Sequence, residues 1–394
     1  MARTFLLSAV EPSADAMGAD LMRALRGALP VPPRFVGCGG DAMRAEGLDS
    51  AFDVRALSVM GLGDAVRAVP AALAAAGRLA KIAREEAPEA AVLIDAWGFS
   101  RLAAPRIKRA SPSTRLVKLA APQVWASRPE RAATAASLFD LILTLLPFEP
   151  PLFEAEGGRA AFVGNPNFQA VAKTPRSGDA FRARHGLGEE RLLAVLPGSR
   201  RSEVERLMPT FGDAVDGVSK EVPGTRIVVV AAPAVEAEVR SACARWTNEA
   251  LIVPAAERFD AFEAAEAALA ASGTVTTELA LCGVPMVVGY KVGRLTAAWA
   301  RRILITDTVT ILNIAAGERV VPERLQEDCT PEQLRADVVR LLTDDEARRR
   351  QLSAFRRVLP RLVGSGDAAA RAAEEIVALL KREDGADLDA SAQG

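Results

Sequence analysis

The chain has 394 residues, of which 50% are hydrophobic and 25% charged, and its 49 basic and 50 acidic side chains nearly cancel. This length exceeds what one ordinary hydrophobic core needs and predicts two domains. The charge balance argues against general nucleic-acid binding, which needs a strong basic excess. The four cysteines lie far apart, without a C-x-x-C pair, so a structural zinc site is not expected.

The N-terminal stretch TFLLSAV predicts a first β-strand rather than a signal peptide. No uninterrupted apolar stretch reaches transmembrane length, and scattered single thiols are typical of a reducing compartment. Together these features predict a cytosolic protein whose contact with any membrane is peripheral.

Strands and helices alternate along both halves of the chain, which predicts an α/β fold with parallel sheets covered on both faces. Strand-bearing segments are expected at 4–10, 33–40, 89–99, 115–125 and 141–150, and again at 191–200, 225–233, 249–255, 267–274 and 285–292. Helices are expected at 14–29, 70–88 and 202–222 and within 331–384. Two doubly wound, Rossmann-like domains facing a central cleft follow from this repeat.

The polar, proline-bearing segment GNPNFQAVAKTPRSGD separates the two halves. We therefore expect one domain over residues 1–165 and a second over residues 166–345. Helices over residues 346–384 are expected to pack back on the N-terminal domain or on a partner subunit. Residues 385–394 are polar and acidic and are expected to be disordered.

The segment LPGSR runs from a strand into Gly198 and Ser199 and then into a helix. Such a turn offers backbone amides to a phosphate, and Arg200 adds a guanidinium that suits the same anion. An ordinary turn with a capping serine is the alternative. The lack of G-x-G-x-x-G and of a GK[ST] ending argues against a dinucleotide fold or a P-loop.

The segment ASGTVTTELAL places Ser272, Gly273 and Thr274 between a strand end and a helix start, where they can cradle a diphosphate. Glu278 follows about one turn later, at a spacing that does not suit a capping box. A carboxylate beside a diphosphate should accept hydrogen bonds from hydroxyls, and a ribose diol meets that need. The pair therefore predicts a nucleoside diphosphate, with a solvated helix acid as the alternative.

Acidic and polar side chains also follow strand ends in the first half. Asp95 ends the strand AVLI and can act as a general base for a hydroxyl, or cap the next helix. Glu11, Ser13 and Asp15 follow the first strand, where they can bind a sugar, although capping by Ser13 or Asp15 explains them equally well. Residues 306–332, around Asn313, indicate only a loop and a helix.

Residues 284–304 mix apolar side chains with Lys291, Arg294, Arg301 and Arg302. This composition suits contact with an anionic membrane surface. A core helix whose basic side chains reach outward to solvent explains it equally well.

Three long segments, LPGSRRSEVERL, ASGTVTTELALCGVPMVVGYKV and TDTVTILNIAAGERVVPERLQEDCTPEQL, resemble the lipid-A-disaccharide synthase family. The similarity extends through EPSADAMGADLMRAL, RFVGCGGDAMRAEG, VLIDAWGF, PQVWA and LPFEP in collinear order, across nearly the whole chain.

The resemblance implies an inverting glycosyltransferase of the GT-B fold. Such an enzyme joins UDP-2,3-diacylglucosamine to 2,3-diacylglucosamine 1-phosphate (lipid X) and releases UDP, without a metal or other cofactor. It also implies a peripheral protein on the cytoplasmic face of the inner membrane, able to dimerise by exchanging C-terminal segments.

The resemblance also implies roles for single residues. Asp95 matches the general base that deprotonates the acceptor 6-hydroxyl, Arg200 matches an arginine that stabilises the leaving UDP, and Asn313 matches an asparagine tied to activity. The resemblance likewise implies a nucleotide-binding segment made of Ser272, Gly273, Thr274 and Glu278. It implies a first cleft motif that contains Glu11 and Ser13.

The sequence departs from the family pattern mostly in its N-terminal half. A first motif that usually reads Gly-Glu-x-Ser-Gly-Asp has Val10 and Ala14 in place of its glycines. We therefore expect UDP-sugar binding to be retained while acceptor detail or efficiency is shifted. Another UDP-sugar enzyme of this architecture, such as a 2-epimerase or a transferase with a different lipid acceptor, is the nearest alternative. A non-catalytic nucleotide- or lipid-binding paralogue is the second alternative.

Overall fold

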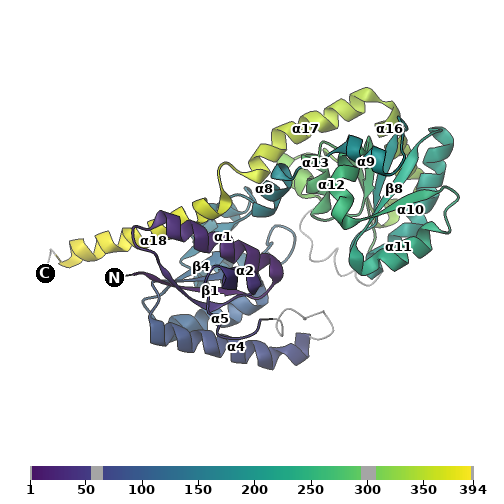
Figure 1. Ribbon diagram of the computed structural model, residues 1–394. Coiled ribbons are helices and arrows are strands. Elements are labelled where there is room, and N and C mark those ends of the chain that lie inside the picture. The colour runs from purple at the N-terminus through teal and green to yellow at the C-terminus, as the bar shows by residue number, and fades with distance from the viewer. Residues whose placement is uncertain (1, 55–64, 294–307, 392–394) are drawn as a thin grey trace. The chain divides into compact units, whose positions relative to one another are not determined.

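The computed structural model describes residues 2–54, 65–293 and 308–391 (Figure 1). The chain divides into two compact units, Met1–Pro166 with Gly364–Gly394 (unit 1) and Asn167–Val363 (unit 2). Each unit contains one parallel sheet of six strands with helices on its faces, so the predicted pair of doubly wound α/β domains is confirmed.

The sheet of unit 1 has the order β2-β1-β3-β4-β5-β6. After β2 the chain crosses back over β1 to form β3, so the strand order reverses between β1 and β3. The strands are β1 (Thr4–Ala9), β2 (Arg34–Cys38), β3 (Ala90–Ile94), β4 (Arg115–Leu119), β5 (Leu141–Thr144) and β6 (Ala160–Phe162). The helices are α1 (Pro12–Ala28), α2 (Asp41–Ala45), α4 (Ala65–Glu86), α5 (Trp97–Ala110), α6 (Arg131–Leu138), α7 (Pro150–Glu154) and α18 (Ala368–Ser391).

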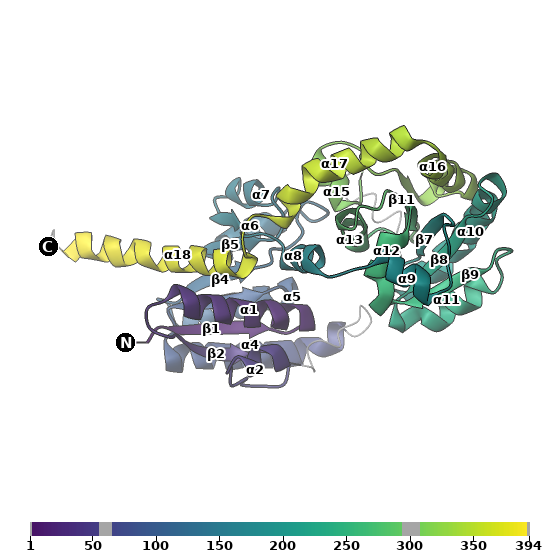
Figure 2. The same cartoon turned by 45° about the horizontal axis from the view of Figure 1, so that its top comes forward.

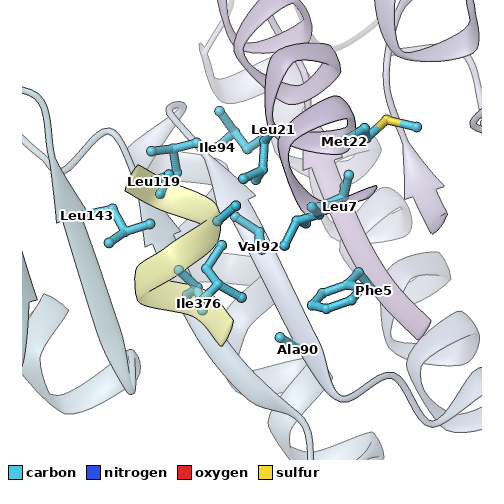
Figure 3. Packing of buried hydrophobic residues seen from close by; sticks show 14 of the residues in the cluster. Phe5, Leu7, Leu21, Met22, Ala90, Val92, Ile94, Leu119, Leu143 and Ile376 are labelled. Atoms are coloured by element: carbon cyan, nitrogen blue, oxygen red, sulfur yellow. The ribbon is translucent and has the colours of Figure 1, made fainter. Parts of the chain in front are cut away.

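Alternate side chains of the unit 1 strands enter two different cores, because successive residues of a strand face opposite sides of the sheet. One core joins Phe5, Leu7, Val92 and neighbouring strand residues to α1 and to Ile376 of α18 (Figure 3). The other joins the intervening strand residues, such as Leu6 and Leu93, to α4, α5 and α6. The strands are therefore apolar on both faces, as expected of a covered parallel sheet.

The C-terminal helices divide between the units. Helix α17 (Asp345–Val363) belongs to unit 2, whereas α18 belongs to unit 1 and lies beside α1 (Figures 1 and 2). Gly364 ends α17 with a φ of 80°, and a Cβ there would lie 2.7 Å from the Cα of Gly164. Instead of the disordered tail expected from residue 385, α18 continues to Ser391 through Ala386, Leu388 and Ala390, since alanine and leucine favour helix.

The sheet of unit 2 has the order β12-β11-β10-β7-β8-β9. Read from β9, this is the doubly wound order 3-2-1-4-5-6, which reverses between β7 and β10. The strands are β7 (Leu192–Leu196), β8 (Arg226–Ala231), β9 (Ala250–Pro254), β10 (Ala267–Ala270), β11 (Met286–Tyr290) and β12 (Glu323–Leu325).

The helices of unit 2 cover both faces of this sheet. They are α8 (Pro166–Lys173, which starts at the last residue of unit 1), α9 (Gly178–Arg184), α10 (Arg201–Glu221), α11 (Glu236–Cys243), α12 (Arg258–Ala264), α13 (Val275–Leu281), α15 (Ile311–Ala316), α16 (Pro331–Thr343) and α17, with short 3₁₀ turns at Pro233–Val235, Ala255–Glu257 and Gln326–Asp328.

We predict that Ile376→Ala destabilises unit 1. Ile376 is fully buried against the sheet, and truncation of a buried isoleucine to alanine costs about 2–5 kcal/mol. The urea midpoint of the variant should fall clearly below that of the wild type. Glu374→Ala, on the exposed side of the same helix, is the matched control and should change the midpoint little. Equal midpoints for Ile376→Ala and the wild type would show that α18 does not contribute to the folded unit.

Candidate functional site

Asp95 lies where β3 ends and α5 begins, in a turn of unusual backbone conformation. Both Asp95 and Ala96 have left-handed dihedral angles, with φ of 50° and 38°. The Asp95 carboxylate is half-buried, and within the described part of the chain no donor is bonded to it. The alternative reading of Asp95 as a helix cap is therefore not what the structure shows. Its carboxylate oxygens are available to a hydroxyl.

A buried lysine that sequence reasoning missed lies next to this turn. Lys118 of β4 is fully buried, and burial lowers the pKa of its ammonium to about 7, against the opposing effect of the Asp95 and Glu11 charges. The pKa of the Glu11 carboxyl is raised, first by partial burial and then by the Asp95 charge. The signal was present in the sequence as a single lysine inside the apolar strand RLVKLAA.

The three candidate residues after the first strand, Glu11, Ser13 and Asp15, differ in burial. Glu11 and Ser13 are exposed around the start of α1. Asp15 is buried, and its carboxylate accepts hydrogen bonds from the amides of Gly40 at 2.7 Å and Ala42 at 2.8 Å. Asp15 thus caps α2 and fixes the loop after β2. The capping alternative describes this residue better than sugar binding does.

A second buried acid closes the loops after β4 and β5. Glu149 is 2% exposed, and burial raises the pKa of its carboxyl to about 7. It accepts hydrogen bonds from the Trp125 indole at 3.1 Å and the Leu146 amide at 3.0 Å. The Trp125 ring packs edge-on against Phe148. These residues come from the PQVWA and LPFEP segments, to which sequence reasoning gave no role.

In unit 2, the LPGSR turn is occupied by its own helix. Glu203 is buried, and its carboxylate accepts hydrogen bonds from the amides of Ser199 at 3.2 Å and Arg200 at 3.3 Å. Gly198, with a φ of 107°, permits this close approach, because a Cβ there would lie 2.5 Å from the Glu203 carboxylate. The Ser199 and Arg200 amides, which could have bound a phosphate, are thus bonded to the Glu203 carboxylate of the first helical turn.

At this turn the guanidinium of Arg200 can still bind an anion. It donates a hydrogen bond to Glu203 at 3.1 Å, yet the side chain is 77% exposed. An exposed arginine held at one end can turn toward a phosphate without unfolding the turn.

The segment from Ser272 to Thr274 lies beside that turn, since β10 pairs with β7 and the Ala271 amide donates to the Leu196 carbonyl at 2.7 Å. Ser272 donates to the Val309 carbonyl at 3.2 Å, and Thr274 is the residue before α13. The strand reversal of unit 2 therefore brings the two predicted donor segments together. In open parallel sheets, ligands bind at this point.

Glu278, one turn into α13, forms an ion pair with a residue that sequence reasoning did not identify. Arg258 of α12 donates from Nε to the Glu278 carboxylate at 3.0 Å. Its guanidinium stacks over the Phe259 ring, with 4.0 Å to the ring centroid. Glu278 is neither a freely solvated acid nor, in this structure, a free acceptor on both oxygens.

Asn313 is buried in unit 2. Its amide donates to the Val321 carbonyl at 2.9 Å, and its carbonyl accepts from the Val321 amide at 2.8 Å. Both polar ends of this side chain are thus bonded within the fold, and its role in activity stays a prediction. Glu323 similarly holds residues 308–310 by accepting from the Thr310 amide at 2.8 Å.

Of the basic residues considered for membrane contact, Lys291 donates to the Thr210 hydroxyl at 2.9 Å, whereas Arg294, Arg301 and Arg302 lie outside the described residues. In the described segments, no helix combines the length and the apolar character needed to cross a membrane. Nor do those segments contain a group of three His, Cys, Asp or Glu side chains placed to hold a metal ion.

Comparison with solved structures identifies the fold. The chain is similar to the UDP-GlcNAc 2-epimerase from Neisseria meningitidis bound to UDP-GlcNAc, with a TM-score of 0.62, 12% identity and coverage of 96% of this chain and 100% of that one. It is also similar to the α,α-trehalose 6-phosphate synthase from Burkholderia multivorans, with a TM-score of 0.60, 12% identity and coverage of 99% and 98%. At this identity the likeness shows the fold alone, and it confirms the predicted GT-B architecture.

Comparison of sequences identifies the family. The chain is 41% identical to the lipid-A-disaccharide synthase of Paramagnetospirillum magneticum over 381 residues, covering 95% of this chain and 97% of that protein. It is 38% identical to the lipid-A-disaccharide synthase of Bradyrhizobium diazoefficiens over 384 residues, covering 96% and 97%. The model of the lipid-A-disaccharide synthetase family matches residues 5–376. The resemblance is confirmed, and the chain belongs to the lipid-A-disaccharide synthetase family.

Proposed function

We propose that the chain is an inverting glycosyltransferase of lipid A assembly. It would join UDP-2,3-diacylglucosamine to lipid X and release the lipid A disaccharide 1-phosphate and UDP. The observation that carries the proposal is the Asp95 carboxylate at the strand reversal of unit 1, to which no donor of the described residues is bonded, in a chain that matches the family from residue 5 to residue 376.

In this reaction Asp95 accepts the proton of the acceptor 6-hydroxyl. The acceptor oxygen then forms a bond to the anomeric carbon of the donor sugar, and the bond from that carbon to the UDP oxygen breaks. Arg200 balances the negative charge that develops on the leaving diphosphate. A positioned base and a positioned cation each act only as charge develops in the transition state.

The donor side of the proposal is supported by the two segments at the strand reversal of unit 2, with Arg200 on one and Ser272 to Thr274 on the other. Glu278, held by Arg258, would face the ribose. The acceptor is a lipid, so we propose that the protein works at the cytoplasmic face of the inner membrane through peripheral contact with anionic lipid. A homodimer formed through C-terminal segments is part of the same proposal.

We predict that Asp95→Asn abolishes most disaccharide formation. Loss of a general base lowers kcat by about 10²–10⁴-fold, while UDP affinity should stay within twofold, because Asp95 belongs to unit 1. The assay is turnover of the two lipid substrates, with the product identified by mass. Glu85→Gln, on the exposed end of α4, is the control and should behave as the wild type. An Asp95→Asn variant with full activity would show that Asp95 is not the general base. A wild-type protein that binds UDP but forms no disaccharide would indicate a different acceptor or a silent paralogue.

Arg200→Ala should weaken donor binding and slow turnover together. A charged hydrogen bond to phosphate contributes about 1.5–3 kcal/mol, so UDP affinity should fall by roughly 10- to 100-fold. Isothermal titration with UDP measures this directly. The matched control is Arg240→Ala, because Arg240 is exposed and pairs with Glu236 one turn earlier in its own helix. Unchanged UDP affinity in Arg200→Ala would exclude Arg200 from the diphosphate site.

The ribose assignment of Glu278 predicts a difference between two nucleotides. Glu278→Gln should lower affinity for UDP by roughly tenfold, because a charged acceptor of the ribose hydroxyls is lost. Affinity for 2′-deoxy-UDP should change much less in the same variant. Equal losses for both nucleotides would show that Glu278 serves the Arg258 pair rather than the sugar.

A further inference from the structure

We infer that Lys118 is a positioning residue for Asp95: its buried ammonium fastens the left-handed turn that presents the carboxylate and opposes the Asp95 and Glu11 charges with a positive one. The inference rests on the proposed function, in which Asp95 is the base. It adds a residue to which the known pattern of the site assigns no role.

The geometry of Lys118 is specific to this turn. Its side chain is fully buried beside β3, and Nζ donates three hydrogen bonds to backbone carbonyls. The acceptors are Asp95 at 2.6 Å, Leu119 at 2.9 Å and Leu93 at 3.2 Å. Two of these carbonyls flank the end of β3, so that one ammonium ties the last residues of the strand to the turn that follows it.

The turn requires such ties. Left-handed backbone at a non-glycine residue costs of order 1 kcal/mol or more and persists only where the surroundings fix it. Here two such residues, Asp95 and Ala96, follow each other. Besides Lys118, the Ser100 hydroxyl donates to the Asp95 carbonyl at 2.9 Å, and the Asp95 amide donates to the Leu119 carbonyl at 2.9 Å. Loosening these bonds lets the turn relax toward common dihedral angles and rotates the carboxylate away.

The charge of Lys118 has a second effect. A fully buried ammonium is expensive to desolvate, and among the described residues its hydrogen-bond acceptors are backbone carbonyls rather than a carboxylate. The charged groups facing it are Asp95, from the turn after β3, and Glu11, from the turn after β1. These two carboxylates repel each other across the strand reversal, because each disfavours a second negative charge nearby. Lys118 offsets that repulsion from the neighbouring strand.

A lysine that merely filled space in β4 would affect stability alone. A lysine that holds and balances Asp95 affects kcat and its dependence on pH as well. Removal of the positive charge makes the carboxylates harder to ionise, so the acid limb of the kcat profile moves to higher pH. The KM for the donor should stay near that of the wild type, since donor binding is assigned to unit 2.

The test is Lys118→Met, with kcat, both KM values and the pH profile measured on the full chain. We expect kcat to fall by about 10- to 100-fold, as for a catalytic group displaced by about 1 Å, and the acid limb to rise by about one pH unit. Lys108→Met is the matched control, because Lys108 also donates to a carbonyl in unit 1, that of Thr114 at 3.0 Å. It should leave kcat and the profile unchanged. A folded Lys118→Met with normal kcat and an unmoved acid limb would overturn the inference.

If Lys118→Met does not fold, Ser100→Ala provides a second test of the inference. It removes the other side-chain donor to the Asp95 carbonyl and leaves the ammonium in place. We expect kcat to fall about 3- to 10-fold with an unmoved acid limb, and unchanged kcat would overturn the positioning of the turn. Asp95→Asn separates this outcome from failure of the proposed function. If Asp95→Asn is fully active, the proposed base is wrong. If Asp95→Asn is inactive and the Lys118 variant is normal, only the inference fails.

Discussion

The reversal of strand order within each parallel sheet is the constraint on which the rest of this structure depends. At this point the connections that follow two neighbouring strands run in opposite directions across the sheet. A crevice that no connection covers therefore lies at the carboxyl ends of these two strands. In unit 1 the reversal places the turn after β1 next to the turn after β3, and with them Glu11 and Asp95. In unit 2 it places the turn after β7 next to the turn after β10.

Buried carboxylates supply the stiffness of the loops at these edges. Asp15 and Glu203 each accept hydrogen bonds from backbone amides of a turn or helix start, and Glu149 accepts from an amide and an indole. A carboxylate bonded to amides satisfies donors that would otherwise be orphaned at a helix start. The same bonds remove those amides from ligand binding. In the proposed function, the group left to bind an anion at the LPGSR turn is therefore the exposed Arg200 guanidinium.

The sequence alone predicted the two parallel sheets and the turns that carry the candidate site residues, because strand–helix alternation and glycine turns are local signals. It predicted the neighbourhood of Asp95 and Arg200 for the same reason. It did not separate Asp15 from Glu11, since both follow one strand and only the packing of α2 shows which acid is buried. It did not show the pairing of Asn313 with Val321 or of Arg258 with Glu278, because these partners lie 8 and 20 residues apart in the chain. Such pairings depend on the fold and cannot be recognised from the spacing of neighbouring residues in the sequence.

The burial of Val10 and Ala14 shows what the two glycine replacements in the first motif change. Val10 and Ala14, which replace the two glycines of the first motif, are 4% and 0% exposed and pack into the two cores of unit 1. Their side chains therefore enlarge the core and do not fill the crevice at the strand reversal. A shift in acceptor choice, if turnover measurements reveal one, must then arise from residues whose side chains remain accessible after β3 and β4. Trp97 after β3 and Ser127 after β4 satisfy this condition, since both side chains are only partly buried.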